Sequence, residues 1–241
     1  GAVYSPALTD FVFVVDNISK MFITGPEVVK TVLGEEVSME DLGGARVHAC
    51  ISGNAHFFAS TEAECFEQIK KLLTFIPWNN QRKAKAFPSK APKAEYNIEK
   101  ILPADPTQPY DVRDIIKAVA DDSDFFEVQQ DFAQNIVVGF GRVDGETIGF
   151  VANQPLVLAG VLDCDSADKA GRFIRFCDAF NIPVLTLVNV KGYKAKMCSE
   201  RRIAKAAARL TYAYANASVP KVTVIVKEAF GSAYLTMGSK S

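Results

Sequence analysis

Histidine is scarce in this chain of 241 residues, which contains only His48 and His56. A histidine-rich metal site, or a triad that needs a histidine far along the chain, is therefore nearly excluded, and we expect no metal. An excess of positive charge is also lacking, because 27 lysines and arginines face 28 aspartates and glutamates. A nucleic-acid binder normally carries a basic excess or a basic face, so nucleic acid is not an expected partner.

The chain contains only five cysteines, an odd number, and no two of them are spaced as C-x-x-C. The first residues show no basic segment leading into an apolar one, so the sequence predicts no secretory signal and reduced thiols in the cytoplasm, or in the mitochondrial matrix of a eukaryote. No apolar run reaches the roughly 18–20 residues that cross a bilayer. The chain starts with Gly1 rather than methionine, which predicts a processed or truncated piece.

The first eighty residues indicate mixed helix and strand. Residues 11–15 form an apolar run typical of a strand. Pro26 suits the first turn of a helix that Gly34 ends. A second helix is predicted over residues 61–76, where Thr61 and Glu64 have the spacing of a capping box.

Between residues 77 and 109 the composition changes, since six of the eleven prolines lie there among several lysines. A stretch this long without periodicity is uncommon inside a compact domain. It favours a linker across the surface between two halves. Phosphate binding by the lysines is the alternative.

Beyond residue 110 the pattern becomes regular. A helix is predicted over residues 111–120, followed by a hairpin of residues 136–143 and 146–152 whose turn is Asp144-Gly145. The apolar run 157–162, a helix over 165–180, residues 183–190, a helix over 199–217 and residues 221–226 then alternate as strand, helix, strand, helix, strand. This alternation predicts an α/β fold with a buried sheet and helices outside it.

Small residues follow the last predicted strand, in the order Gly231-Ser232-Ala233-Tyr234. At a strand-to-helix junction they leave backbone N–H groups free to hold an oxyanion. Tight packing of helix on sheet explains the same pattern equally well. A second small-residue turn, Lys191-Gly192-Tyr193, follows the preceding strand. Both turns are expected at the carboxyl edge of the sheet, where they can line one cleft.

Several stretches of the chain resemble the carboxyltransferase subunits of biotin-dependent acyl-CoA carboxylases and decarboxylases, of the propionyl-CoA or methylmalonyl-CoA type. The resemblance covers almost the whole chain with several independent motifs. They include residues 4–8, 43–45, 111–116, 121–127, 153–155, 159–163, 173–183, 219–222 and 231–234, together with His48 and His56.

This resemblance implies a crotonase-like fold of two similar halves. Residues 1–80 then belong to the N-terminal half, 81–110 are the linker, and 111–241 begin the C-terminal half. It also implies a hexamer built as a trimer of dimers. An enolate of a short-chain acyl-CoA, of the acetyl or propionyl class, attacks carbon dioxide released from carboxybiotin. The expected partners are a biotin carboxyl carrier protein and either a biotin carboxylase or a membrane decarboxylase subunit.

By position in the family, the backbone of Ser232 and Ala233 supplies an oxyanion hole toward the biotin carbonyl. Gly231 and Gly192 shape the pocket, and Tyr234 and Leu235 border it, with Tyr234 serving in packing. The matching oxyanion hole of the N-terminal half is expected before residue 1, so the chain alone is expected to be inactive.

Two departures from the family pattern leave alternative functions open. Lys191-Gly192-Tyr193 stands where carboxylases read Pro-Gly-Phe, and Leu235 replaces an aspartate common in propionyl-type members. The alternatives are the carboxyltransferase component of a biotin-linked (methyl)malonyl-CoA decarboxylase, or an inactive fragment of such a subunit. His48 and His56 are expected to make structural hydrogen bonds.

Overall fold

The structure is a computed structural model that describes residues 3–105 and 107–238, apart from the side chain of Cys198. The chain divides into two compact units, one holding the residues up to Leu73 together with Gln129–Ala133, the other Thr74–Val128 and the residues from Gln134 on. Within the described ranges no helix is both long and apolar enough to cross a membrane. The division into related halves over 1–80, 81–110 and 111–241 stays a prediction.

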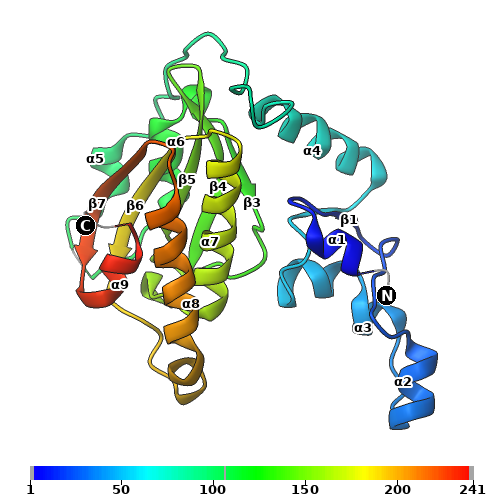
Figure 1. Cartoon of the computed structure of the whole chain (residues 1–241). Helices are drawn as coiled ribbons and strands as arrows, with labels where there is room; N and C mark the ends of the chain where they lie inside the picture. The colour runs from blue at the N-terminus through cyan, green and yellow to red at the C-terminus, as the bar shows by residue number, and fades with distance from the viewer. Residues whose placement is uncertain (1–2, 106, 239–241) are drawn as a thin grey trace. The chain divides into compact units, whose positions relative to one another are not determined.

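The first unit is built around a small parallel sheet. Its strands are β1 (Phe13–Val15) and β2 (Phe57–Ala59), with Phe13 opposite Phe57. Its helices include α1 (Tyr4–Leu8), α2 (Pro26–Leu33), α3 (Met39–Gly43) and a π-helix over Val47–Ile51 (Figure 1). The predicted limits of α2 are confirmed, because a proline opens the helix and Gly34 closes it in the left-handed region at φ 72°.

The second unit contains a five-stranded sheet. In spatial order its strands are β3 (Phe125–Val128), β4 (Ile136–Val143), β5 (Glu146–Asn153), β6 (Val184–Val190) and β7 (Lys221–Ala229). The first three run antiparallel, whereas β5, β6 and β7 run parallel. The parallel strands are joined by α7 (Cys164–Ala179) and α8 (Met197–Asn216), which lie side by side along the sheet (Figure 1).

The middle of this sheet, at β4 and β5, is covered on both faces, as the predicted buried sheet requires. Val222 and Ile225 of the edge strand β7 are exposed. On one face Phe140 of β4 packs against Phe173 of α7 with ring centroids 5.0 Å apart. On the other face α6 (Val112–Val119) contributes Ile115 and Ile116 to a core that also contains Phe150 of β5. The predicted α/β architecture with helices outside a buried sheet is confirmed.

The hairpin between β4 and β5 forms as predicted, because Asp144 and Gly145 have φ values of 52° and 80°. The proline-rich segment is attached to this turn, since Phe87 donates its N–H to the Gly145 carbonyl at 3.0 Å. The Arg142 guanidinium lies 4.2 Å from the ring centroids of both Phe75 and Phe87. This segment also contains a short helix, α5 (Ile98–Ile101).

Two local expectations are corrected. The apolar run 157–162 is not a strand, because Leu158, Ala159 and Gly160 form a 3₁₀ turn with φ values of 50°, 51° and 72°. The capping box of α4 (Glu62–Phe75) is only half present. The Thr61 hydroxyl accepts from the Glu64 N–H, whereas the Glu64 carboxylate accepts from Ser60, one residue earlier than predicted.

Candidate functional site

The carboxyl ends of β6 and β7 lie next to each other and carry the two turns that the sequence singles out. The strands pair in parallel from Val184 opposite Lys221 to Val188 opposite Ile225, and then resume with Val190 opposite Ala229. Three residues of β7 therefore face the single residue Asn189, which makes a bulge. Bulges re-aim the chain beside functional sites.

The buried side chain of Asn189 stabilises this bulge through hydrogen bonds. Its Oδ1 accepts the Glu228 N–H at 3.2 Å, and its Nδ2 donates to the Tyr110 hydroxyl at 3.1 Å. The Asn189 N–H donates to the side chain of Asn153 at 3.2 Å. Burial raises the pKa of Tyr110 to about 12, with the bond from Asn189 acting in the opposite sense. Tyr110 therefore serves as a neutral hydrogen-bonding group.

Lys227 fastens the bulge to the segment that precedes α6. Its Nζ donates to the carbonyl oxygens of Pro103 and Asp105, each at 3.3 Å, and lies 5.5 Å from the Tyr110 ring centroid. These contacts connect this end of the sheet to residues that the sequence analysis assigns to the linker.

The first turn, Lys191-Gly192-Tyr193, follows β6 directly. The Gly192 carbonyl accepts the Leu162 N–H at 3.0 Å, and Leu162 and Tyr193 form an isolated parallel bridge. Gly192 has φ 151°, and a Cβ added there would find nothing within 4 Å. The glycine therefore suits its backbone conformation and leaves space beside the turn.

The second turn opens α9 (Gly231–Thr236) directly after β7. Gly231 has φ 57°, and a Cβ on it would also meet nothing within 4 Å. Tight packing thus does not explain this glycine. The N–H groups of Ser232 and Ala233 lie in the first helical turn, where the helix supplies no acceptor. Ala233 is buried, whereas Ser232 and Leu235 are exposed and Tyr234 is half-buried.

The structure brings these two turns together, as the sequence predicts. Phe230 donates its N–H to the Val190 carbonyl at 3.1 Å. The Tyr193 hydroxyl lies 3.3 Å from the Ser232 carbonyl oxygen and 2.5 Å from the Thr236 Oγ1. The sequence interpretation missed Asn189 and Thr236, and it named Tyr193 only as part of its turn. The available signal was a buried asparagine near the end of a largely apolar strand.

The charged groups beside the turns are paired. Lys191 lies 3.3 Å from Glu228 across the strand ends, with both side chains partly exposed. Lys194 lies 3.3 Å from Asp163, which caps the N-terminus of α7. Burial opposes ionisation of Asp163, but the bonds from Ser166, Asn135 and Lys194 outweigh it and lower its pKa.

Both histidines lie in the first unit and make hydrogen bonds there. His48 contacts the Met21 carbonyl through Nε2 at 2.8 Å and the Ser52 hydroxyl through Nδ1 at 3.0 Å. The Nδ1 of His56 accepts the Val12 N–H at 3.1 Å. Both rings are buried, so the predicted structural role is confirmed. Among the described residues no group of three histidine, cysteine or acidic side chains is placed to bind a metal.

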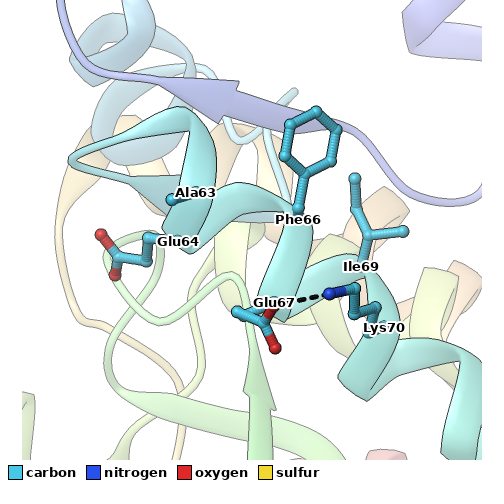
Figure 2. A pocket seen from close by; sticks show the side chains of 6 residues that line it. All are labelled: Ala63, Glu64, Phe66, Glu67, Ile69 and Lys70. Atoms are coloured by element: carbon cyan, nitrogen blue, oxygen red, sulfur yellow. Dashed lines mark hydrogen bonds and ion pairs between the residues drawn. The ribbon is translucent and has the colours of Figure 1, made fainter.

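A hollow of about 560 Å³ lies on the first unit, along one side of α4. Figure 2 shows that its lining side chains all come from this one helix. Phe66 is 61% exposed, and Lys70 forms an ion pair with Glu67 at 2.7 Å. The hollow is a shallow apolar strip bordered by paired charges rather than an enclosed site. Its lining residues are Ala63, Glu64, Phe66, Glu67, Ile69 and Lys70.

Comparison with known proteins identifies the family to which the chain belongs. The model of the carboxyl transferase domain matches residues 1–241. The chain belongs to this carboxyltransferase family. The α/β architecture is its crotonase-like carboxyltransferase fold, as the sequence predicts.

Three relatives illustrate the match. The chain is 51% identical to a propionyl-CoA carboxylase beta chain of Saccharopolyspora erythraea and 48% identical to the methylmalonyl-CoA decarboxylase subunit alpha of Veillonella parvula. Both alignments include all of this chain, and 46% and 48% of those relatives. A crystal structure of transcarboxylase 12S superposes with a TM-score of 0.94 at 44% identity, over 98% of this chain and 47% of that one. The chain spans about half the length of the relatives it matches.

Proposed function

We propose that the natural protein with this sequence is the carboxyltransferase component that moves a carboxyl group between carboxybiotin and a short-chain acyl-CoA. The supporting observation is the pair of glycine turns at one sheet edge. Gly192 and Gly231 both leave open space, and the N–H groups of Ser232 and Ala233 follow directly. Family membership supplies the reaction class.

We propose that the residues at this edge bind a biotin ring system. Biotin presents a flat, neutral ureido group whose carbonyl oxygen accepts hydrogen bonds, and it carries carbon dioxide as its N-carboxylate. In the proposal, Ser232 and Ala233 donate their N–H groups to that oxygen. Gly192 and Gly231 leave room for the ring, and Tyr234 and the exposed Leu235 border it. Backbone donors hold their direction in advance, so they stabilise charge that develops on the oxygen without reorganising.

The proposed acyl-CoA class is the propionyl or acetyl type, and the relative from Saccharopolyspora is named a propionyl-CoA carboxylase beta chain. A second candidate is the carboxyltransferase component of a (methyl)malonyl-CoA decarboxylase, which the 48% identity to the Veillonella subunit favours. The decarboxylase releases the carboxyl group of a malonyl-type CoA without ATP. Direction of transfer is thus the property that separates the two.

The proposed partners follow from the same chemistry. A carrier protein has to bring biotin to the sheet edge, and either a biotin carboxylase or a membrane decarboxylase subunit has to load or unload it. We propose a homohexamer, a trimer of dimers, since the transcarboxylase 12S relative is described as a hexamer. The proposed location is the cytoplasm.

The experiment is a transcarboxylation assay of the natural protein with free biotin and malonyl-CoA or methylmalonyl-CoA. Ser232→Pro removes one donor from the first turn of α9, a position that accepts proline. We expect kcat to fall about 10²- to 10³-fold, the usual effect of losing one oxyanion-hole donor. Met39→Pro makes the same kind of change in the first turn of α3 and is expected to keep full activity.

Circular dichroism and sedimentation confirm that both variants remain folded and assembled. Absence of biotin-dependent transfer in the unaltered protein would contradict the proposed function. Full activity in a folded Ser232→Pro protein would remove Ser232 from the proposed site.

A further inference from the structure

Two hydroxyl groups on different segments lie within hydrogen-bond distance of the Ser232 carbonyl oxygen. The Thr236 Oγ1 donates to it at 2.9 Å, and the Tyr193 hydroxyl lies 3.3 Å from it. The two hydroxyl oxygens are 2.5 Å apart. Each hydroxyl has one proton, and we assign that of Thr236 to the carbonyl because its oxygen is the nearer of the two, at 2.9 Å against 3.3 Å. Tyr193 is therefore the donor toward Thr236, and the bonds run in series from Tyr193 through Thr236 to Ser232.

The carbonyl of Ser232 and the N–H of Ala233 belong to the same peptide group. That group is planar, and its oxygen and hydrogen point in opposite directions. Whatever fixes the direction of the Ser232 carbonyl therefore fixes the direction of the Ala233 N–H. The bond from Thr236 to the carbonyl, strengthened by the bond from Tyr193 to Thr236, also polarises the peptide, which makes its N–H a stronger donor.

From this geometry we propose that Tyr193 and Thr236 are positioning residues that aim and strengthen the Ala233 N–H. The inference rests on the proposed function, in which that N–H donates to the ureido oxygen of biotin. Ala233 stabilises the negative charge that reaches this oxygen when the N–CO₂ bond breaks and its electron pair stays on the ureido group. Neither hydroxyl touches the substrate in this arrangement.

The arrangement also joins the two turns of the site. Tyr193 stands at the end of the turn that follows β6, next to Gly192, whereas Thr236 lies on α9. The backbone of Tyr193 is held through its bridge to Leu162. Its hydroxyl thus acts from a fixed position on the opposite turn. A displacement of the Gly192 turn would change the direction of the Ala233 donor.

Tyr193→Phe removes the first hydroxyl of the series while keeping the ring. In the natural protein we expect kcat for biotin-dependent transfer to fall about tenfold, less than the 10²- to 10³-fold loss of a donor that is removed outright. The KM for acyl-CoA should change less than about twofold, since charge on the ureido oxygen develops only in the transition state. Tyr212→Phe is the matched control, because it removes a tyrosine hydroxyl from the exposed side of α8.

Thr236 tests whether the two hydroxyls act in series. Thr236→Val keeps the shape of this buried side chain, and its kcat should fall at least as far as that of Tyr193→Phe. The double variant should lose no more than Thr236→Val alone, because residues acting through one group are not additive. Thr236→Ser retains a hydroxyl and should restore most of the activity. Additive losses in the double variant would contradict the series.

The ureido carbonyl stretch of bound biotin, isolated by ¹³C labelling in difference infrared spectra, gives a readout apart from turnover. We expect the frequency lowered by the unaltered protein to return part of the way toward its value in water in Tyr193→Phe, and to stay lowered in Tyr212→Phe. An equal frequency and equal kcat in Tyr193→Phe would overturn this inference alone. Absence of any bound-biotin signal in the unaltered protein would overturn the proposed function, and the inference with it.

Discussion

The backbone N–H of Phe230 donates to the carbonyl oxygen of Val190 at 3.1 Å, and this bond joins the ends of two parallel strands beyond a bulge. One residue of β6 and three of β7 separate the last regular pair, Val188 and Ile225, from the next pair, Val190 and Ala229. The following residues, Lys191 and Gly231, open the two glycine turns. The position of one turn relative to the other is therefore set by backbone bonds.

The left-handed backbone at Gly231 leads to the first prediction. Gly231→Ala should cost about 1–2 kcal/mol of folding free energy, the usual penalty for a side chain in this region. Its activity should fall about tenfold or more in addition, because the new methyl group occupies the space beside the proposed donors.

Gly34→Ala provides the control for Gly231→Ala. Gly34 has φ 72° and the same open surroundings, but it ends α2, far along the chain from the glycine turns. Urea unfolding should show similar losses for both variants, and the transfer assay a loss for Gly231→Ala alone. Equal activities would show that the space at Gly231 is not used.

Asp163 gives a prediction about pH. Its carboxylate caps α7, and hydrogen bonds lower its pKa in the folded protein despite burial. A lowered folded-state pKa contributes stability above the unfolded-state value of about 3.9, and that stability is lost as the pH falls through the folded-state pKa. Asp163→Asn keeps an N-cap but cannot carry the charge.

The unaltered protein should therefore exceed Asp163→Asn in unfolding free energy by about 1 kcal/mol at pH 6 to 7. The difference should shrink below about pH 4, as Asp163 becomes protonated. Urea unfolding of both proteins across this range measures it. A difference independent of pH would show that the charge of Asp163 contributes nothing.

The contact of Arg142 with two aromatic rings leads to a prediction about how the proline-rich segment is protected from proteolysis. Phe87→Ala removes one of two rings that contact the guanidinium. Loss of about 1 kcal/mol or more from this contact should raise local opening about fivefold or more. Trypsin should then cleave faster after Lys83, Lys85 and Lys90. Trp78→Ala, which removes an aromatic ring that is 85% exposed, should leave the cleavage rate unchanged.

Features governed by local backbone rules could be predicted from the sequence. Pro26 and Gly34 mark the ends of α2, and Asp144-Gly145 marks the hairpin turn, because each rule concerns residues adjacent in the chain. The strand-to-helix junction at Gly231 follows from the same kind of argument. The pairing of the two glycine turns needed only the rule that parallel strands end at one edge.

The remainder depends on contacts between residues far apart in sequence. Tyr193 meets Thr236 across 43 positions, and Asn189 meets Tyr110 across 79. No periodicity reveals such pairs. The run at 157–162 shows the opposite failure, because its apolar residues suggested a strand while Leu158 and Ala159 adopt left-handed backbone angles. Composition there indicated neither the conformation nor the burial, since Leu158 and Ala159 are exposed.

The bulge at Asn189 has a consequence for how this sheet edge can change in length. Three residues of β7 stand against one of β6, an excess of two. Side chains alternate between the faces of a strand with a period of two, so an even excess preserves which face each later residue occupies. An insertion or deletion of a single residue between Ile225 and Ala229 would turn Gly231 toward the opposite face. We therefore expect length changes that are tolerated at this position to come in steps of two residues.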